Sequence, residues 1–397
     1  MRRPDPALVV ILAGIGAALH VGKLPPAITA LQAALQLSLV EAGFLLSLVQ
    51  LAGMAAGAAF GLVSDTLGPR RSQIGGLLLL AAASAAGGAV SSAAPLMLLR
   101  ALEGFGFLLV VLPAPGMVRR LVAPEKLAGM LGVWGAYMPT ATAFALLVGP
   151  LAIGMLGWRA WWWVLAAVSL VLAVAVAFGV PALPAPAVQP GGWTQRLRRT
   201  LAAREPWLMA LSFAMYSGQW LSVVGFLPTL YQQAGLGGAA VGVLTALAAA
   251  VNALGNLLGG ALLQRGQPAR RLMTVGFCTM AAAAITAYAF PALPAALRYA
   301  AVLAFSMVGG MIPATLFSMA VHAAPDEDTI ATTVGWMQQW SAFGQFAGPP
   351  LVAWVASRVG GWQFTWVVTG ACSVAGLLLA RTLAAQVEKK RYAAIRH

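Results

Sequence analysis

The chain has 397 residues, of which 60% are apolar and only 9% are charged, and its formal net charge is +14. An ordinary soluble domain carries about 25% charged residues, so the composition excludes that class. The alternating ten-residue segments that a membrane β-barrel requires are absent. The composition therefore predicts an all-α membrane protein.

Apolar segments long enough to cross about 30 Å of hydrocarbon as helices recur from end to end. In chain order, we predict twelve transmembrane helices at 7–30, 42–62, 72–92, 95–118, 127–150, 160–181, 206–230, 238–263, 272–291, 295–320, 330–354 and 362–384. If both termini are cytoplasmic, the outer loops receive only Arg159, Arg298 and Arg358 of the 24 basic residues. This distribution follows the positive-inside rule and accounts for the net charge without nucleic acid as a partner.

The longest polar stretch, at 181–206, is basic and rich in Pro and Gly, which is typical of a linker. We predict a six-helix bundle over 1–181, a cytoplasmic linker over 182–205, and a second bundle with a basic tail over 206–397. Landmarks of the first half recur in the second, at an offset of about 200 residues. "GKLPPA" at 22–27 matches "GFLPTL" at 225–230. These matches predict two pseudo-symmetric bundles.

The sequence "GLVSDTLGPRR" at 61–71 lies between the second and third predicted spans. It resembles the G-x-x-x-D-x-x-G-x-R-[RK] loop of major facilitator transporters, with matches at Gly61, Asp65, Gly68, Arg70 and Arg71. The resemblance covers the whole chain and implies secondary transport by alternating access, with this loop as a cytoplasmic gate. It also implies that the protein is not an enzyme.

The fourth span provides a second resemblance. "RALEGFG" at 100–106 is similar to the family's R-x-x-x-G-x-G pattern, through Arg100, Gly104 and Gly106. In proton-coupled members the arginine is associated with coupling. The Gly-Pro pattern of drug/proton antiporters is only partly present. With its "GKLPPA" first span, the chain resembles the cyanate/nitroimidazole permease branch.

Four ionisable side chains lie well inside predicted spans, away from the span ends, where such groups are costly and are functional candidates. Counting 1.5 Å per residue, Lys23 and Arg100 share one depth, and His20 and Glu103 another. In the family that the chain resembles, the first and fourth spans both line the central cavity. That resemblance implies that the four residues cluster there, with Glu103, Arg100 and His20 in proton coupling and Lys23, Arg100 and His20 in substrate binding. Alternatively, Glu103 is a permanently paired ion, Lys23 reaches to the outer interface, and His20 is a neutral hydrogen-bonding group.

The second half has no matching charges and offers aromatic and amide side chains instead. For the body of the substrate we predict contacts from five residues of spans 7 and 11: Tyr216, Gln219, Trp220, Gln338 and Gln339. The alternative is that these side chains only join helices to one another.

An excess of positive charge in the cavity favours an anionic substrate. The leading hypothesis is a monomeric transporter in a bacterial inner membrane, moving a small organic anion by proton symport. The alternatives are a proton-driven exporter of lipophilic compounds and a lipid flippase. The two cysteines, Cys278 and Cys372, are interpreted as small buried apolar side chains. We expect no metal, no cofactor and no catalytic residue, since neither ligand clusters nor nucleophile motifs occur.

Overall fold

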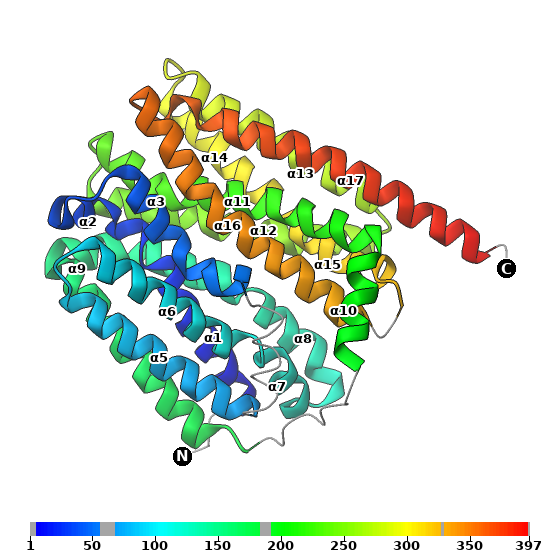
Figure 1. The fold of residues 1–397 in the computed structure, drawn as a ribbon. Helices are drawn as coiled ribbons and strands as arrows, with labels where there is room; N and C mark the ends of the chain where they lie inside the picture. Colours follow the sequence, from blue (N-terminus) through cyan, green and yellow to red (C-terminus); the bar gives the residue numbers. More distant parts are fainter. Residues whose placement is uncertain (1–4, 56–67, 183–191, 327–328, 396–397) are drawn as a thin grey trace. The chain divides into compact units, whose positions relative to one another are not determined.

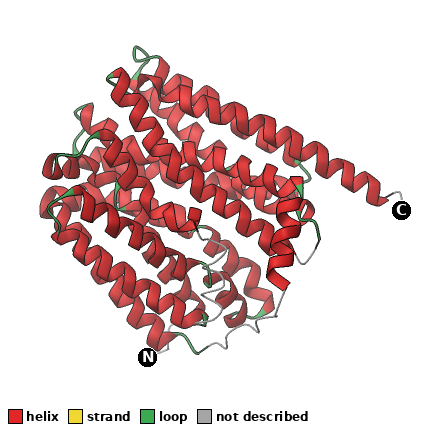
Figure 2. Cartoon of the chain, viewed as in Figure 1, coloured by secondary structure: helices red, strands yellow, loops and turns green. Residues whose placement is uncertain are grey.

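The computed structural model describes residues 5–55, 68–182, 192–326 and 329–395. Within these ranges every regular element is helical, as Figures 1 and 2 show. The predicted all-α class is therefore confirmed for the described part of the chain.

Nine helical segments of the described residues are long and apolar enough to cross a membrane. They are Pro6–Leu35, Pro69–Ala89, Ala93–Leu121, Tyr137–Gly179, Arg204–Gln233, Gly238–Gln264, Ala269–Ala289, Ala295–Ala320 and Trp362–Leu383. A shorter apolar helix, Leu39–Ala55, begins where the second span was predicted. The number twelve and the cytoplasmic location of both termini remain predictions.

The difference between nine and twelve has identifiable causes. The predicted fifth and sixth spans both lie largely within α9 (Tyr137–Gly179), a single 43-residue assignment. The chain departs from helical geometry inside α9 at Gly157, whose φ is 82°. Side chains with a Cβ rarely adopt that backbone conformation, so Gly157 allows the turn between two helical arms. The eleventh predicted span lies in α16 (Ile330–Val359), which is long enough but is not among the nine.

The chain divides into two compact units, and each is described by itself. The first contains residues Met1–Val188 and Val224–Ala250, and the second Gln189–Val223 and Val251–His397. The helices α11 (Arg204–Gln233) and α12 (Gly238–Gln264) therefore contribute residues to both. The predicted division around a linker at 182–205 remains a prediction. Part of that stretch is itself helical, as α10 (Gly192–Ala202).

In the first unit, α1 packs against α6 and α9, and α5 packs against the same two helices. The elements of this unit that precede α9 are α1 (Pro6–Gly22), η1 (Pro25–Ala27), α2 (Ile28–Leu35), α3 (Leu39–Ser47), η2 (Leu48–Gln50), α5 (Pro69–Ala89), α6 (Ala93–Val111), α7 (Ala114–Leu121) and α8 (Pro124–Gly135). The buried α1 is thus the central helix on which the other elements assemble.

Prolines interrupt the first predicted span. Pro25 and Pro26 open a short 3₁₀ turn after α1, because proline lacks the N–H that would continue the helix. The Ala27 N–H donates to the Leu24 carbonyl, so the Lys23 carbonyl has no helical partner there. It instead accepts a hydrogen bond of 3.1 Å from Trp161 Nε1. The break is therefore compensated inside the unit.

In the second unit, α13 packs against α14, α15 and α17. Besides α10 and α16, this unit contains α13 (Ala269–Ala284), η3 (Ile285–Ala289), α14 (Ala295–Gly309), α15 (Met311–Ala323), η5 (Trp362–Phe364) and α17 (Thr365–Ile395). Cys372 is half-buried, but Cys278 is exposed on α13, so the interpretation of both as buried is wrong. An apolar residue of a span faces lipid as readily as it faces protein, and the sequence does not distinguish the two.

Candidate functional site

Two short segments of the first unit supply the four ionisable residues of the predicted cluster. His20 lies in the last turn of α1, and Lys23 follows as the residue that ends the helix. Arg100 and Glu103 lie one turn apart on the buried face of α6. Residues three apart occupy one face of a helix, so each segment presents both of its polar side chains in one direction.

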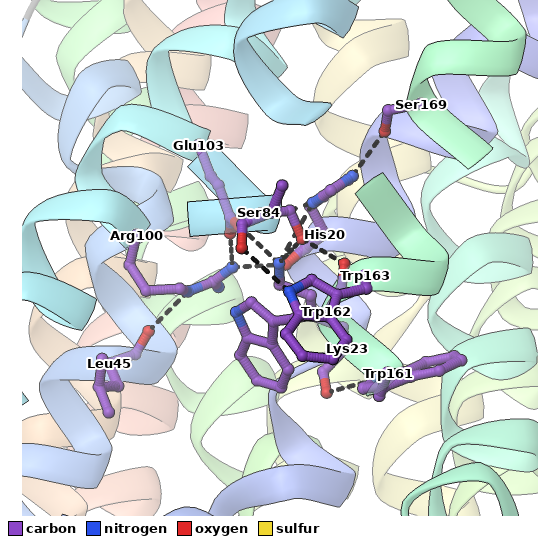
Figure 3. A network of polar contacts seen from close by, with 11 residues as sticks. His20, Lys23, Leu45, Ser84, Arg100, Glu103, Trp161, Trp162, Trp163 and Ser169 are labelled. Atoms are coloured by element: carbon purple, nitrogen blue, oxygen red, sulfur yellow. Dashed lines mark hydrogen bonds and ion pairs between the residues drawn. The ribbon is translucent and has the colours of Figure 1, made fainter. Parts of the chain in front are cut away.

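The structure brings all four side chains together, as Figure 3 shows. Glu103 is at the centre: its Oε1 is paired with Lys23 Nζ and its Oε2 with Arg100 Nη1. His20 Nδ1 lies 3.7 Å from Glu103 Oε1. No member of the cluster is more than 1% exposed. The alternative that Lys23 reaches to the outer interface does not hold in this structure, because its amino group is held inside the unit.

Lys23 has further partners around its ammonium group. Its Nζ donates a hydrogen bond of 2.8 Å to Ser84 Oγ, and it lies 4.6 Å from the centre of the Trp162 ring. The Ser84 hydroxyl in turn donates to the Trp162 carbonyl at 2.8 Å. A carboxylate, a hydroxyl and an aromatic face thus surround one cation, which compensates for its removal from water.

The contacts of His20 define its tautomer. Lys23 Nζ lies 3.3 Å from Nδ1, and an ammonium can only donate, so Nδ1 is the acceptor. The proton then lies on Nε2 and is donated to Ser169 Oγ at 2.7 Å. This assignment makes His20 neutral, in agreement with the hydrogen-bonding alternative.

Arg100 is anchored to backbone as well as to Glu103. Its Nη1 donates to the His20 carbonyl at 2.7 Å and its Nε to the Leu45 carbonyl at 3.3 Å. Its Nη2 is buried and has no hydrogen-bond partner among the described residues, and the same holds for Trp162 Nε1. Buried donors are nearly always satisfied in proteins, so each of these atoms calls for an acceptor from water or a solute.

The charges of the cluster do not cancel. With His20 neutral, two cations face one carboxylate, and one positive charge is in excess. The arrangement can therefore hold an anion or accept a proton on Glu103. Within the described ranges, His, Cys, Asp and Glu side chains form no group of three or more that could hold a metal ion.

The predicted gate loop is only partly covered by the structure. Gly61 and Asp65 lie outside the described residues. Gly68 precedes α5 with φ at 83°, a conformation that favours glycine. Arg70 donates to the Ala177 carbonyl at the end of α9, and Arg71 is exposed. The role of this loop as a cytoplasmic gate thus remains a prediction.

The two glycines of the "RALEGFG" pattern lie where helices touch. A Cβ on Gly106 would lie 2.9 Å from the Gly76 carbonyl oxygen of α5. Gly104 faces the backbone of Val49 in the same way. The two glycines therefore allow α6 to approach its neighbours closely, and this close packing helps to bury Arg100 and Glu103.

The candidates of α11 in the second unit are engaged in hydrogen bonds between helices. Tyr216, which is 5% exposed, accepts a hydrogen bond of 2.9 Å from Asn252 Nδ2. Gln219, at 1% exposed, accepts one of 3.0 Å from Ser373 Oγ. These contacts agree with the alternative that the two side chains join helices.

The other three candidates of the second unit are more accessible. Trp220 is half-buried, and its Nε1 donates to Ser306 Oγ at 3.0 Å. On α16, Gln338 is exposed and Gln339 is half-buried. Their accessibility leaves all three able to contact a solute.

Several polar or aromatic residues of these networks were not predicted from the sequence. Ser84, Ser169 and Trp162 complete the cluster of the first unit, but single serines and tryptophans in apolar spans give no distinct signal. Asn252 could have been found. It and Asn256 lie one turn apart in an otherwise apolar span, and Asn256 Nδ2 lies 3.2 Å from Asn252 Oδ1.

Comparison with known proteins adds a family and a fold. A family model described as the Major Facilitator Superfamily matches residues 7–349. No curated protein is similar enough in sequence to match the chain. Among solved structures, a bacterial homolog of the human lysosomal transporter Spinster, inward-facing and unoccupied, is similar at a TM-score of 0.76 and 16% identity, covering 98% of this chain and 97% of that one.

The occupied inward-facing form of that homolog is similar at a TM-score of 0.77 and 15% identity, with the same coverage of 98% and 97%. At this level of identity the likeness shows the fold alone.

Proposed function

This chain belongs to the Major Facilitator Superfamily, and from that premise we propose that it moves a small organic anion together with protons. The coarser statement, a multi-pass membrane transporter of small solutes, follows from the family. The anion, the proton and the residues that handle them are the proposal. We further propose that it works as a monomer in a bacterial inner membrane.

The observation that carries the proposal is the composition of the buried cluster. Glu103 is shared by Lys23 and Arg100, so the carboxylate is outnumbered. Two donors, Arg100 Nη2 and Trp162 Nε1, are buried with no acceptor in the part of the chain that the structure describes. An oxyanion supplies both negative charge and acceptor lone pairs, whereas a lipophilic cation supplies neither. The cluster therefore favours an anion over the substrates of a drug exporter.

Coupling to protons follows from competition for the same cations. While Glu103 is ionised, its two oxygens occupy Lys23 and Arg100. A proton on Glu103 removes its charge and frees both cations to bind the carboxylate of a substrate. Proton binding and anion binding then favour each other, and by linkage the effect is reciprocal. This reciprocity is the requirement for symport.

His20 is the competing proton site, and its geometry makes it the weaker candidate. A proton on Nδ1 would have to displace the Lys23 ammonium, which occupies that position at 3.3 Å. Glu103 needs no such displacement. In the second unit we retain Trp220, Gln338 and Gln339 as candidates for binding the organic body of the solute, and assign Tyr216 and Gln219 to packing.

The test is transport in proteoliposomes with a panel of labelled small carboxylates. With an inward pH gradient, the wild type should concentrate one or more of these anions. Glu103→Gln keeps the shape of the side chain but cannot ionise. It should still exchange the anion down its gradient and should not concentrate it in response to pH.

A matched control is Glu41→Gln in the same unit. Glu41 is a surface carboxylate that completes the capping box of α3 with Ser38, and Gln preserves that motif. Glu41→Gln should accumulate the anion like the wild type. If Glu103→Gln still concentrates the anion, Glu103 is not the proton site. If no anion moves and lipophilic cations leave the vesicles, the exporter hypothesis replaces the proposal.

A further inference from the structure

The second unit has an open cavity of about 450 Å³ that is separate from the buried cluster. It lies between α13 and α17 and has a basic lining, formed by Pro268, Arg270, Arg271, Thr274, Val275 and Arg381. The proposed transport cycle does not use this cavity. Its chemistry indicates an anionic ligand.

The position of the cavity in the two helices places it at a membrane interface. Four lining residues lie at the beginning of the span Ala269–Ala289, namely Arg270, Arg271, Thr274 and Val275. Arg381 lies near the end of the span Trp362–Leu383. These ends coincide because the two helices pack together. Further into the span Gly376 lies against the Phe277 ring, with no room for a Cβ. The cavity is therefore the place where two contacting spans separate at one surface of the membrane.

The positive charge of the cavity is not neutralised by the residues that line it. Arg270, Arg271 and Arg381 are all exposed, and none of the lining residues is acidic. Arg271 Nη1 donates to the neutral Gln267 Oε1 at 3.1 Å. The cavity also adjoins the beginning of α13, where no side chain caps the helix, so the helix dipole adds to the positive potential.

Apolar side chains continue from the cavity along the same helices. Val275 is 42% exposed in the cavity wall. On α17, Val374 and Leu378 are 57% and 60% exposed. Their spacing of four and three residues places them on one helix face with Arg381. The surface thus changes from apolar to basic along the direction in which a phospholipid changes from acyl chain to phosphate.

We propose that this cavity binds the headgroup of an anionic phospholipid, with the phosphate on Arg270, Arg271 and Arg381. The acyl chains would lie on Val374 and Leu378. Basic pockets between spans at a membrane surface are suited to such headgroups. A free phosphate ion would use the arginines but not the apolar face, and this difference separates the two sources of phosphate.

The test is native mass spectrometry of the purified protein in detergent, titrated with phosphatidylglycerol or with phosphatidylcholine. The wild type should bind phosphatidylglycerol more tightly than phosphatidylcholine. A basic residue near an anionic lipid surface contributes about 1 kcal/mol, which is about fivefold in affinity. Arg381→Gln should therefore bind about fivefold more weakly, and the triple variant Arg270→Gln/Arg271→Gln/Arg381→Gln about a hundredfold.

A second triple variant removes the same charge from exposed arginines outside the cavity: Arg119→Gln/Arg198→Gln/Arg265→Gln. It should retain the lipid as the wild type does. Equal losses in the two triple variants would show a general charge effect and overturn the proposal. Unchanged binding in both would overturn it too. If the triple variant of the cavity does not fold, the single variant Arg381→Gln tests the proposal, and unchanged binding of phosphatidylglycerol in it would overturn the proposal.

A competition experiment with inorganic phosphate distinguishes a lipid headgroup from a free phosphate ion as the ligand of the cavity. At constant ionic strength, millimolar phosphate should leave phosphatidylglycerol bound, because it cannot replace the contacts of the acyl chains. Displacement by phosphate would assign the cavity to a free anion and overturn the lipid proposal. This test does not depend on transport, so its failure and that of the proposed function are distinguishable.

Discussion

Lys23, at the end of α1, is paired with Glu103 of α6, although 80 residues separate them and neither is more than 1% exposed. A buried ion pair of this kind is a weak source of stability, because desolvation offsets much of the Coulomb attraction. Removing one partner is costly when it leaves the other charge buried alone. Stability alone therefore does not account for the pair, and this agrees with the proposed role of Glu103 in proton coupling.

Removing the charge of Glu103 and removing the charge of Lys23 should have unequal effects on the free energy of unfolding. Glu103→Leu leaves Lys23 and Arg100 buried without a counter-charge, and we expect a loss of about 3–5 kcal/mol. Lys23→Met leaves the pair of Arg100 and Glu103 complete, so its loss should be clearly smaller. Thermal unfolding of the purified protein in detergent compares the two. Equal losses would contradict the conclusion that positive charge is in excess.

Arg100 should not be replaceable by lysine. Its guanidinium reaches the His20 and Leu45 carbonyls and Glu103 at once, a fork that a lysine cannot reproduce. Arg100→Lys should raise the KM for the transported anion at least tenfold, since one charge-assisted hydrogen bond contributes about 1.5–3 kcal/mol.

The control for Arg100→Lys is Arg159→Lys in the same unit. Arg159 Nη1 donates to the Gly88 and Val90 carbonyls at 2.9 and 2.8 Å, outside the cluster. Its replacement also costs backbone contacts, but it should leave the KM unchanged. A rise in KM in both variants would mean that loss of packing, and not loss of the anion site, explains the effect.

The close approach at Gly106 should be sensitive to a single methyl group. In Gly106→Ala the new Cβ would lie 2.9 Å from the Gly76 carbonyl oxygen, and helix backbones can move apart only by disturbing the cluster. We expect a loss of about 1–3 kcal/mol in unfolding free energy. Gly116→Ala on α7 meets open space and is the control. It should be neutral or slightly stabilising, and a similar loss there would exclude the steric explanation.

The contact between Asn252 and Tyr216 should couple energetically. A double-mutant cycle of Asn252→Leu and Tyr216→Phe isolates the hydrogen bond of 2.9 Å. Hydrogen bonds between membrane helices average about 0.6 kcal/mol and reach about 1.7 kcal/mol, and we expect a coupling in this range. Transport by Tyr216→Phe should be nearly normal if Tyr216 only joins helices. A large loss of anion affinity would return Tyr216 to the substrate site.

Much of the fold could be predicted from the sequence because the membrane requires it. A span must be apolar and about 20 residues long, so most helices were located within a few residues of their observed bounds. The exceptions are informative. α9 joins two predicted spans, and its break depends on the backbone angle of Gly157 alone.

The residues of the site were also predictable, but the pairing of their charges was not. Ionisable side chains are so costly in a span that His20, Lys23, Arg100 and Glu103 were conspicuous in an apolar sequence. Their matching depths, together with the resemblance to a family in which the first and fourth spans line one cavity, predicted that they cluster.

The sequence by itself determined which helices form and which charges lie inside them, because both follow from the cost of placing polar groups in hydrocarbon. Only the tertiary structure decided how those charges are satisfied. It paired Glu103 with both cations and placed Ser84 beside Lys23 and Ser169 beside His20. It also left Arg100 Nη2 with no acceptor among the residues that it describes. These partners lie far apart in the chain, and the packing of small residues such as Gly104 and Gly106 brings them together. Hydrophobic periodicity contains no information about which polar atoms then meet.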